Sequence, residues 1–267
     1  MRVKMKNGNS RKGWAFVLTL MMVFTTLFGG FSFLGLNGGA EDAYAADGIA
    51  YAEGAPAGTA GAELTYTIKT EDQLRALART VSSGSGIKYE HTTFILQNDL
   101  SLTGGAWTPI GVRDIVFAGT FDGGDKTISG DLFNSDYQFF GLFGHTIGST
   151  IKNLRVNVTI TSTCTSGYIG GLVAMNKNGT IQNCSATAII RGDKISRAGG
   201  LVGWNYGGTI TNSSATGEVN SSNLSGGLVA ENQDGTITNS FATGDVNSSN
   251  VTGGLVGENI GYLEHTE

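Results

Sequence analysis

The sequence is poor in cysteine, in proline and in charged residues, which make up 15% of its 267 residues. Two cysteines, Cys164 and Cys184, are too few for the disulfide framework of a small secreted domain. Two prolines beside 42 glycines argue against collagen and against a proline-rich linker. Because the hydrophobic content is 40%, global disorder is also excluded. The chain therefore has the composition of a packed, glycine-rich fold.

Basic residues are missing from the C-terminal part of the chain. Arg197 is the last of them, and seven carboxylates follow it. Such a surface repels phosphate polymers, so we exclude nucleic acids as partners. The same charge disfavours binding to an anionic membrane surface.

Motifs of common active sites are also absent. None of the three histidines lies at metal-ligand spacing from another histidine or a cysteine. No nucleophile elbow, phosphate-binding loop or dinucleotide fingerprint occurs in its required context. We therefore expect a protein that is not an enzyme.

One group of carboxylates leaves an alternative open, because paired carboxylates about 5 to 9 Å apart can cleave a glycosidic bond. Two of its members, Asp122 and Asp125, flank a Gly-Gly pair, which is typical of a turn. We favour turn and surface roles for the group and keep calcium binding and catalysis as alternatives. The group comprises Asp114, Asp122, Asp125, Asp131 and Asp136.

The N-terminus has the pattern of a signal peptide over residues 1–45. Basic residues precede an apolar stretch from Trp14 to Leu36, and Ala43-Tyr44-Ala45 forms a cleavage site. We expect a secreted or cell-surface protein that meets the membrane only through this segment, which is long enough to span a bilayer if it is retained. Residues 46–62 are rich in Gly and Ala and are predicted to be a linker.

A single amphipathic helix is predicted near the start of the mature chain. Thr70 and Gln73 form a capping box, and apolar residues follow at helical spacing as far as Val81. Short strand-like runs separated by glycine-rich turns then begin at Thr92. We expect residues 63–139 to form an N-terminal cap and the first strands of a β-rich core.

An internal repeat occupies residues 140–267. The tetrapeptide Gly-Gly-Leu-Val begins at Gly170, Gly199, Gly226 and Gly253, at spacings of 29, 27 and 27 residues. A Thr-Ile block and an Ala-Thr block keep step with it. Periods of 20 to 50 residues indicate a solenoid, a propeller or an array.

The interior of the repeat selects among these folds. Ile237 and Ala242 are separated by an odd step, so one straight strand cannot direct both side chains to the same face. We predict one corner at Asn239-Ser240 and a second marked by Asn232, which divide each repeat into two or three short strands. The prediction is an all-β, right-handed parallel β-helix with rungs of 27 to 29 residues and one N-terminal capping helix.

Stacked rungs place equivalent residues side by side, so three ladders are expected. Two consist of asparagines and one of leucines. The first asparagine ladder is Asn176, Asn205, Asn232 and Asn259. The second includes Asn183, Asn212 and Asn239. The leucine ladder, which should form the core, includes Leu172, Leu201, Leu228 and Leu255.

Stacking also brings like charges together, because Glu218 and Asp245 share one repeat position and Glu231 and Glu258 share another. Equivalent residues on adjacent rungs lie about 4.8 Å apart, so these pairs repel unless they are solvated or bridged by Ca²⁺. We favour solvated carboxylates and keep calcium as the alternative cofactor.

Two features are candidate binding sites. The tripeptide Arg191, Gly192 and Asp193 is integrin-like and lies in a repeat that is two residues longer than the next, so we place it on a loop. The other is the most variable part of the repeat, where Trp204 and Tyr206 in one copy correspond to Glu231 and Gln233 in the next. These positions are where we expect a ligand to be recognised.

The repeat resembles the GLUG motif of bacterial secreted and cell-surface proteins. The resemblance rests on GGLVG-x-N followed by GTI-x-N-S-x-A-T-G and covers about Phe140 to Gly261. It implies a β-helix module of the kind found in adhesins and in large secreted enzymes, including immunoglobulin A peptidases. The peptidase signature H-E-x-x-H is absent, so that activity is not implied for this chain.

We therefore expect a non-catalytic, exported adhesion or structural module that presents a polar face to a cell-surface glycan or protein. Two alternatives remain: the non-catalytic N-terminal part of a larger secreted enzyme, and a β-helix that cleaves polysaccharides. The sequence stops at Glu267 before the last rung is complete, so we also expect self-association through that rung or a continuation of the chain.

Overall fold

The computed structural model describes residues 50–51, 64–82, 86–134, 136–192 and 194–261. The chain divides into two compact units, Met1–Glu41 and Asp42–Glu267, and every described residue belongs to the second. The predicted signal peptide lies outside the described residues, as does the linker apart from residues 50–51. No helix within the described ranges has the length and apolar character needed to cross a membrane.

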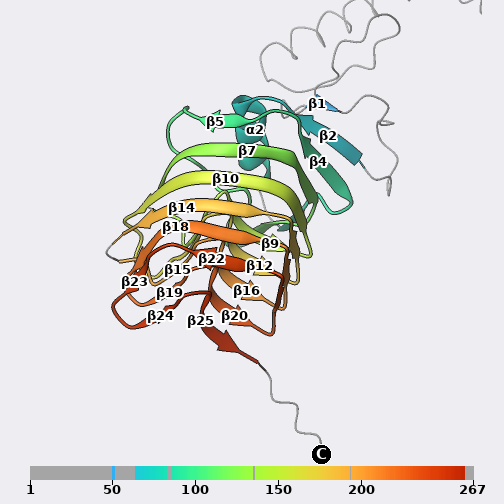
Figure 1. Ribbon diagram of the computed structural model, residues 1–267. Helices are drawn as coiled ribbons and strands as arrows, with labels where there is room; N and C mark the ends of the chain where they lie inside the picture. The colour runs from blue at the N-terminus through green and yellow to red at the C-terminus, as the bar shows by residue number, and fades with distance from the viewer. Residues whose placement is uncertain (1–49, 52–63, 83–85, 135, 193, 262–267) are drawn as a thin grey trace, which may run out of the picture. The chain divides into compact units, whose positions relative to one another are not determined.

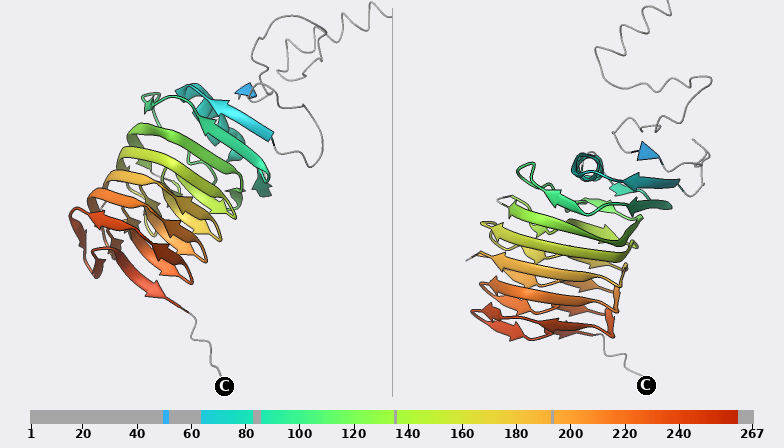
Figure 2. Two further views of the ribbon diagram at one scale, coloured as in Figure 1. Left: turned by 45° about the vertical axis from the view of Figure 1, so that its right-hand side comes forward. Right: turned by 45° about the horizontal axis from the view of Figure 1, so that its top comes forward.

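The described chain is a β-solenoid of about seven turns with about 28 residues in each (Figures 1 and 2). The prediction of a parallel β-helix is confirmed. Equivalent residues pair in parallel from rung to rung, so that Asn205 in one rung is the partner of Asn232 in the next. The antiparallel pair of β1 and β2 at the N-terminal end is an exception.

The strands form three sheets that run along the solenoid. The 13-stranded sheet contains β1 (Ala50–Tyr51), β2 (Leu64–Ile68), β4 (Thr92–Leu96), β5 (Leu100–Leu102), β7 (Thr120–Asn134), β10 (Thr150–Ser162), β13 (Thr180–Gln182), β14 (Ser185–Arg191), β17 (Thr209–Thr211), β18 (Ser214–Ser221), β21 (Thr236–Thr238), β22 (Phe241–Thr243) and β23 (Val246–Ser248). The five-stranded sheet contains β8 (Phe139–Phe140), β11 (Tyr168–Gly170), β15 (Arg197–Gly199), β19 (Leu224–Gly226) and β24 (Val251–Gly253). The seven-stranded sheet contains β3 (Gly86–Lys88), β6 (Ile115–Phe117), β9 (Phe143–Ile147), β12 (Val173–Lys177), β16 (Val202–Tyr206), β20 (Val229–Gln233) and β25 (Val256–Ile260).

Left-handed residues bend the chain between strands. Asn239 has a φ of 49°, as expected for the corner predicted there, and Asn183 and Asn212 take the same conformation at their own rungs. The second corner, predicted at Asn232 before Asp234-Gly235, is present but falls at Asp234, with a φ of 53°, because Asn232 itself lies within β20. Asparagine at position 232 serves the core instead of the turn.

The turn predicted between Asp122 and Asp125 is present as a bend, in which Gly124 and Asp125 are left-handed and Gly124 N donates to Asp122 Oδ1 over 3.0 Å. β7 runs through these residues from Thr120 to Asn134. Asp125 has a φ of 59°, and the pairing register with β10 shifts between Lys152 and Leu154. The segment is therefore a bend inside a paired strand, comparable to the bend at the asparagines of later rungs.

The leucine ladder lies in the core except at its C-terminal end. Leu172, Leu201 and Leu228 are completely buried, whereas Leu255 is 40% exposed because no described rung covers it. The prediction that Leu255 belongs to the core was therefore wrong for the described structure.

One asparagine ladder is buried and the other is exposed. In the buried ladder Asn205 Nδ2 donates to Asn232 Oδ1 over 2.8 Å and to the Gly208 carbonyl over 2.9 Å. Asn176 and Asn232 make equivalent bonds, so the ladder continues to Asn259. This pairing satisfies amides that would otherwise cost free energy in the core.

The exposed ladder joins the asparagines at the bends. Asn183 Nδ2 donates to Asn153 Oδ1 over 3.2 Å, and Asn212 Nδ2 donates to Asn183 Oδ1 over 3.3 Å.

Aromatic rings fill the core of the N-terminal rungs. Phe117 and Phe121 lie 5.6 Å and 5.3 Å from Phe143, measured between ring centroids, and all three are buried. Trp107 is buried beside them and donates its indole N–H to the Gly141 carbonyl over 3.1 Å.

The predicted helix is α2 (Glu71–Val81), and it covers the N-terminal end of this core (Figures 1 and 2). Its apolar face buries Leu74, Leu77 and Val81. The Gln73 amide N–H donates to Thr70 Oγ1 over 3.3 Å, as a capping box requires. The Gln73 side chain accepts from Lys69 N at 2.8 Å, one residue before the predicted position.

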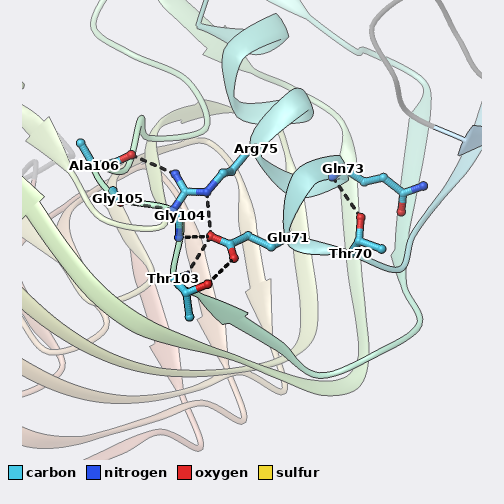
Figure 3. Close-up of polar contacts among 8 residues, drawn as sticks. All are labelled: Thr70, Glu71, Gln73, Arg75, Thr103, Gly104, Gly105 and Ala106. Atoms are coloured by element: carbon cyan, nitrogen blue, oxygen red, sulfur yellow. Dashed lines mark hydrogen bonds and ion pairs between the residues drawn. The ribbon is translucent and has the colours of Figure 1, made fainter.

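Glu71 attaches the start of the helix to the loop after β5 (Figure 3). Its carboxylate accepts hydrogen bonds from the amides of Thr103 and Gly104 and from the Thr103 hydroxyl. It also pairs with Arg75 Nε at 2.8 Å, and Arg75 donates to the carbonyls of Gly105 and Ala106. Burial favours the neutral carboxyl, but these bonds together lower the pKa of Glu71 to about 2.

Candidate binding site

The most varied side chains of the solenoid meet where the five-stranded and seven-stranded sheets adjoin. Each rung contributes the first residue of a strand in the five-stranded sheet and the third residue of a strand in the seven-stranded sheet. We call this line of half-buried and buried residues the seam. Its aromatic, charged and polar members are Phe139, His145, Tyr168, Arg197, Trp204 and Glu231, and Met175 and Leu224 fill the same positions on other rungs with apolar side chains.

Three aromatic rings of the seam are stacked across successive rungs. The centroids of Phe139 and Tyr168 are 5.5 Å apart, and those of Tyr168 and Trp204 are 5.0 Å apart with 16° between the rings. Such pairs contribute about 0.5 to 1.5 kcal/mol each beyond the area that they bury. The stack therefore orders large rings that remain partly accessible at the surface.

An ion pair continues the seam beyond the rings. Arg197 Nε lies 2.6 Å from Glu231 Oε2, and the Arg197 guanidinium lies 4.9 Å from the centroid of the Tyr168 ring. The Glu231 residue is only 5% exposed. Burial raises the pKa of its carboxyl, the Arg197 charge opposes that shift, and Glu258 on the next rung raises the pKa further. Arg197 thus compensates a carboxylate that would otherwise be buried without a partner.

The seam also contains unused hydrogen-bonding capacity. Two of its buried side-chain nitrogens, Nε2 of His145 and Nε1 of Trp204, lack a hydrogen-bond partner in the described structure. Arg197 Nε and Glu231 Oε2, by contrast, satisfy each other in the ion pair. Native structures rarely leave such atoms unsatisfied without a functional or solvent-related reason.

His145 is held by its other nitrogen. Its Nδ1 lies 2.7 Å from the Arg113 carbonyl, so Nδ1 carries the proton and Nε2 is the free acceptor. Burial lowers the pKa of the ring, which is therefore neutral at pH 7. The Phe139 ring lies beside it, with centroids 5.5 Å apart.

The binding residues predicted from the variable part of the repeat lie in or beside the seam. Trp204 and Glu231 belong to it and are register partners. Tyr206 contacts Trp204 edge to face at 5.7 Å, and Lys177 Nζ lies 5.6 Å from the Tyr206 ring centroid. Gln233 is the register partner of Tyr206 on the next rung.

The integrin-like tripeptide lies elsewhere. Arg191 and Gly192 border a polar hollow of about 470 Å³ at the C-terminal end of β14, in the 13-stranded sheet. Arg191 pairs with Glu218 at 3.6 Å, and both side chains are largely exposed. Asp193 lies outside the described residues.

The two carboxylate pairs differ from each other. Glu231 and Glu258 are register partners, and Arg197 compensates the first of them. Glu218 accepts from Asn220 Nδ2 at 2.9 Å in addition to its pairing with Arg191. In the ranges described above, no group of three or more His, Cys, Asp or Glu side chains is arranged to hold a metal ion.

Sequence reasoning missed Phe139, His145, Tyr168 and Arg197. Tyr168 and Arg197 both lie two residues before a Gly-Gly pair, so an alignment of the rungs shows that this position varies. The alignment does not show that this position contacts the variable position in the next sheet. That contact depends on how the two sheets meet in space.

Comparison with known proteins supports the repeat assignment. A family model described as the GLUG motif matches residues 196–220 and residues 221–247. Each match spans one rung, the first from β15 to β18 and the second from β19 to β23. No curated protein and no solved structure matches the chain. Residues 196–247 thus carry two GLUG motifs, each of which forms one turn of the β-solenoid, as the repeat pattern predicted.

Proposed function

We propose that this chain is an exported, non-catalytic module that binds a cell-surface glycan or protein through the seam. The observation that carries the proposal is the stack of Phe139, Tyr168 and Trp204 followed by the Arg197–Glu231 pair. Aromatic and arginine side chains are the residue types that most often dominate the energy of binding surfaces.

The rest of the repeated surface supports this choice by contrast. On the 13-stranded sheet like residues pair with like, as in Thr187 with Thr216 at 3.0 Å and Thr211 with Thr238 at 3.1 Å. These hydroxyls stabilise the stack through one another. The seam departs from this pattern and places unlike chemical groups in contact, which stacking alone does not require.

Secretion or cell-surface location follows from the signal-peptide pattern and belongs to the same proposal. A weak site on an exported repeat protein gains affinity when several copies engage one surface. Fractionation of the producing cells tests the location. Recovery of the full-length chain from the cytoplasm alone would contradict it.

Self-association through the last described rungs is a second candidate. Phe241, Val251, Leu255 and Ile260 are between 39% and 58% exposed there. Exposed strand edges with apolar side chains favour pairing with another chain. Sedimentation over a range of concentrations tests this candidate, and an unchanged monomer would rule it out.

The binding proposal is tested by screening the purified chain on glycan and cell-surface protein arrays. The variant Trp204→Met removes the indole but keeps a side chain that the preceding rung accepts at the equivalent position, Met175. We expect it to lose binding of the captured ligand, whereas Thr216→Ala on the 13-stranded sheet keeps it. Equal binding by both variants would show that the ligand binds outside the seam.

The enzyme alternatives are tested on the same arrays. Release of reducing ends or of peptide fragments by the purified chain would contradict the non-catalytic part of the proposal.

A further inference from the structure

A hollow of about 390 Å³ lies at the N-terminal end of the seam. One wall is a turn that includes Arg113 and Asp114, and the other is the segment that leads into β8. Its side chains combine charged, amide and aromatic groups. They include Arg113, Asp114, Asp136, Tyr137, Gln138 and Phe139.

Both walls are held by the backbone. Val112 and Ile115 exchange two backbone hydrogen bonds of 2.7 Å and 3.0 Å, which close the turn of the first wall. In the second wall the backbone carbonyl of Gln138 accepts a hydrogen bond from Tyr168 N at 2.7 Å. The Tyr137 ring is stacked on the buried Phe140 ring, with centroids 6.2 Å apart. The hollow is therefore formed before a ligand arrives, which lowers the entropic cost of binding.

The hollow is continuous with the seam. Phe139 lines the hollow and stacks on Tyr168, the next aromatic residue of the seam. His145 lies against the same Phe139 ring and bonds to the Arg113 carbonyl in the opposite wall. A ligand that fills the hollow and extends along the solenoid axis would therefore reach Tyr168 and then Trp204.

The charges of the hollow select the ligand class. Asp114 and Asp136 outnumber Arg113 among the lining residues, which disfavours a carboxylate or sulfate group relative to an uncharged ligand. Carboxylates and amides accept hydrogen bonds from hydroxyl groups, and the half-buried rings offer apolar surface to the C–H faces of a sugar. Alternating hydroxyl groups and apolar faces are the chemical pattern of an uncharged carbohydrate.

We infer that the hollow binds the end residue of an uncharged oligosaccharide whose following residues lie along the seam over Tyr168 and Trp204. This inference rests on the proposed function and adds the ligand class, its direction and a second contact point. Asp114 and Gln138 bind hydroxyl groups of the end residue, and Tyr137 and Phe139 contact its ring.

The experiment is calorimetric titration of the full chain with uncharged oligosaccharides of one to six residues and with oligogalacturonate as the acidic probe. The uncharged series comprises cello-, xylo-, manno- and chito-oligosaccharides. We expect one uncharged series to bind more tightly with each added residue up to the span from the hollow to Trp204. Oligogalacturonate should bind more weakly than every uncharged ligand of that length.

Three variants locate the contacts. Asp114→Asn should weaken binding by about tenfold or more, the usual effect of losing a charge-assisted hydrogen bond. Trp204→Met should weaken the binding of long ligands and leave the affinity for the shortest ligand unchanged. Thr216→Ala, in β18 of the 13-stranded sheet, is the matched control and should bind as the parent chain does. Circular dichroism shows whether each variant is folded.

The outcomes separate the inference from the proposed function. If oligosaccharides bind and only Trp204→Met weakens them, the seam is the site and the assignment of the hollow is wrong. If the acidic probe binds best, the ligand class is wrong. If no oligosaccharide binds but a protein from the array does so through Trp204, the proposed function stands and this inference fails.

Discussion

The two ends of the solenoid are stabilised in different ways. In the N-terminal rungs, buried phenylalanines such as Phe121 and Phe143 pack ring against ring in pairs that do not repeat. In the C-terminal rungs, Leu201 and Leu228 stack like on like, and Asn205 and Asn232 are hydrogen-bonded in the same manner. A repeated contact depends on register alone, whereas an unrepeated one depends on the fit of two particular side chains.

The candidate site lies between the unrepeated N-terminal core and the repeated C-terminal rungs. Its aromatic residues begin at Phe139, in the rung before the first Gly-Gly-Leu-Val copy, and end at Trp204, inside a matched GLUG motif. The repeats provide a regular backbone, and the departures from the repeat provide the chemistry.

Removing a ring from the N-terminal core should have the largest effect on stability. Phe143→Ala should lower the free energy of unfolding by about 3 to 5 kcal/mol, because it opens a cavity between Phe117 and Phe121. The matched control is Phe241→Ala at the other end, where the side chain is 58% exposed and the change should stay within about 0.5 kcal/mol. Denaturant unfolding measures both, and similar losses would contradict the contrast between the two ends.

Breaking the buried asparagine ladder should cost slightly less. Asn205→Ala leaves the Gly208 carbonyl and the side chains of Asn176 and Asn232 without their partner, so we expect a loss of about 3 kcal/mol. In the exposed ladder Asn212→Gly preserves the left-handed backbone and removes only a surface amide, so its cost should be below about 1 kcal/mol. If the two losses were equal, the buried ladder would have no special role in the core.

The stability that the Glu71 carboxylate contributes at the N-terminal cap should depend on pH. The pKa of Glu71 is about 2 in the folded chain and rises to its ordinary value near 4.5 on unfolding, so its contribution is present above pH 4.5. That contribution disappears as the pH falls towards 2. Glu71→Gln should therefore be less stable than the parent chain by about 1 kcal/mol at pH 7 and equally stable near pH 2. A stability difference that did not change with pH would show that the charge of Glu71 is unimportant.

The repeated features could be predicted because the neighbour of each residue in a stack is its own counterpart. The repeat period is sufficient to predict the rung. The odd spacing of Ile237 and Ala242 is sufficient to predict the bend at Asn239. The role of Asn232 was not predictable in the same way, because asparagine suits both a turn and a buried ladder and only its hydrogen bond to Asn259 distinguishes them.

Only part of the candidate site could be predicted. Trp204 and Glu231 were found because they differ between otherwise similar copies. Tyr168 lies 36 positions before Trp204 on a different sheet, and no periodicity in the sequence connects the two. The hollow beside Phe139 depends on a turn that belongs to no repeat.

The central claim is that the seam joins unlike residues from adjacent rungs, and the Arg197–Glu231 pair tests it most directly. A double-mutant cycle uses Arg197→Leu and Glu231→Met, because Leu224 and Met175 occupy the same two positions on other rungs. Each single change leaves the other charge without its partner, so we predict a coupling free energy of about 1 to 3 kcal/mol at pH 7. If the effects of the two single changes add to within about 0.5 kcal/mol, Arg197 and Glu231 do not interact and the claim is contradicted.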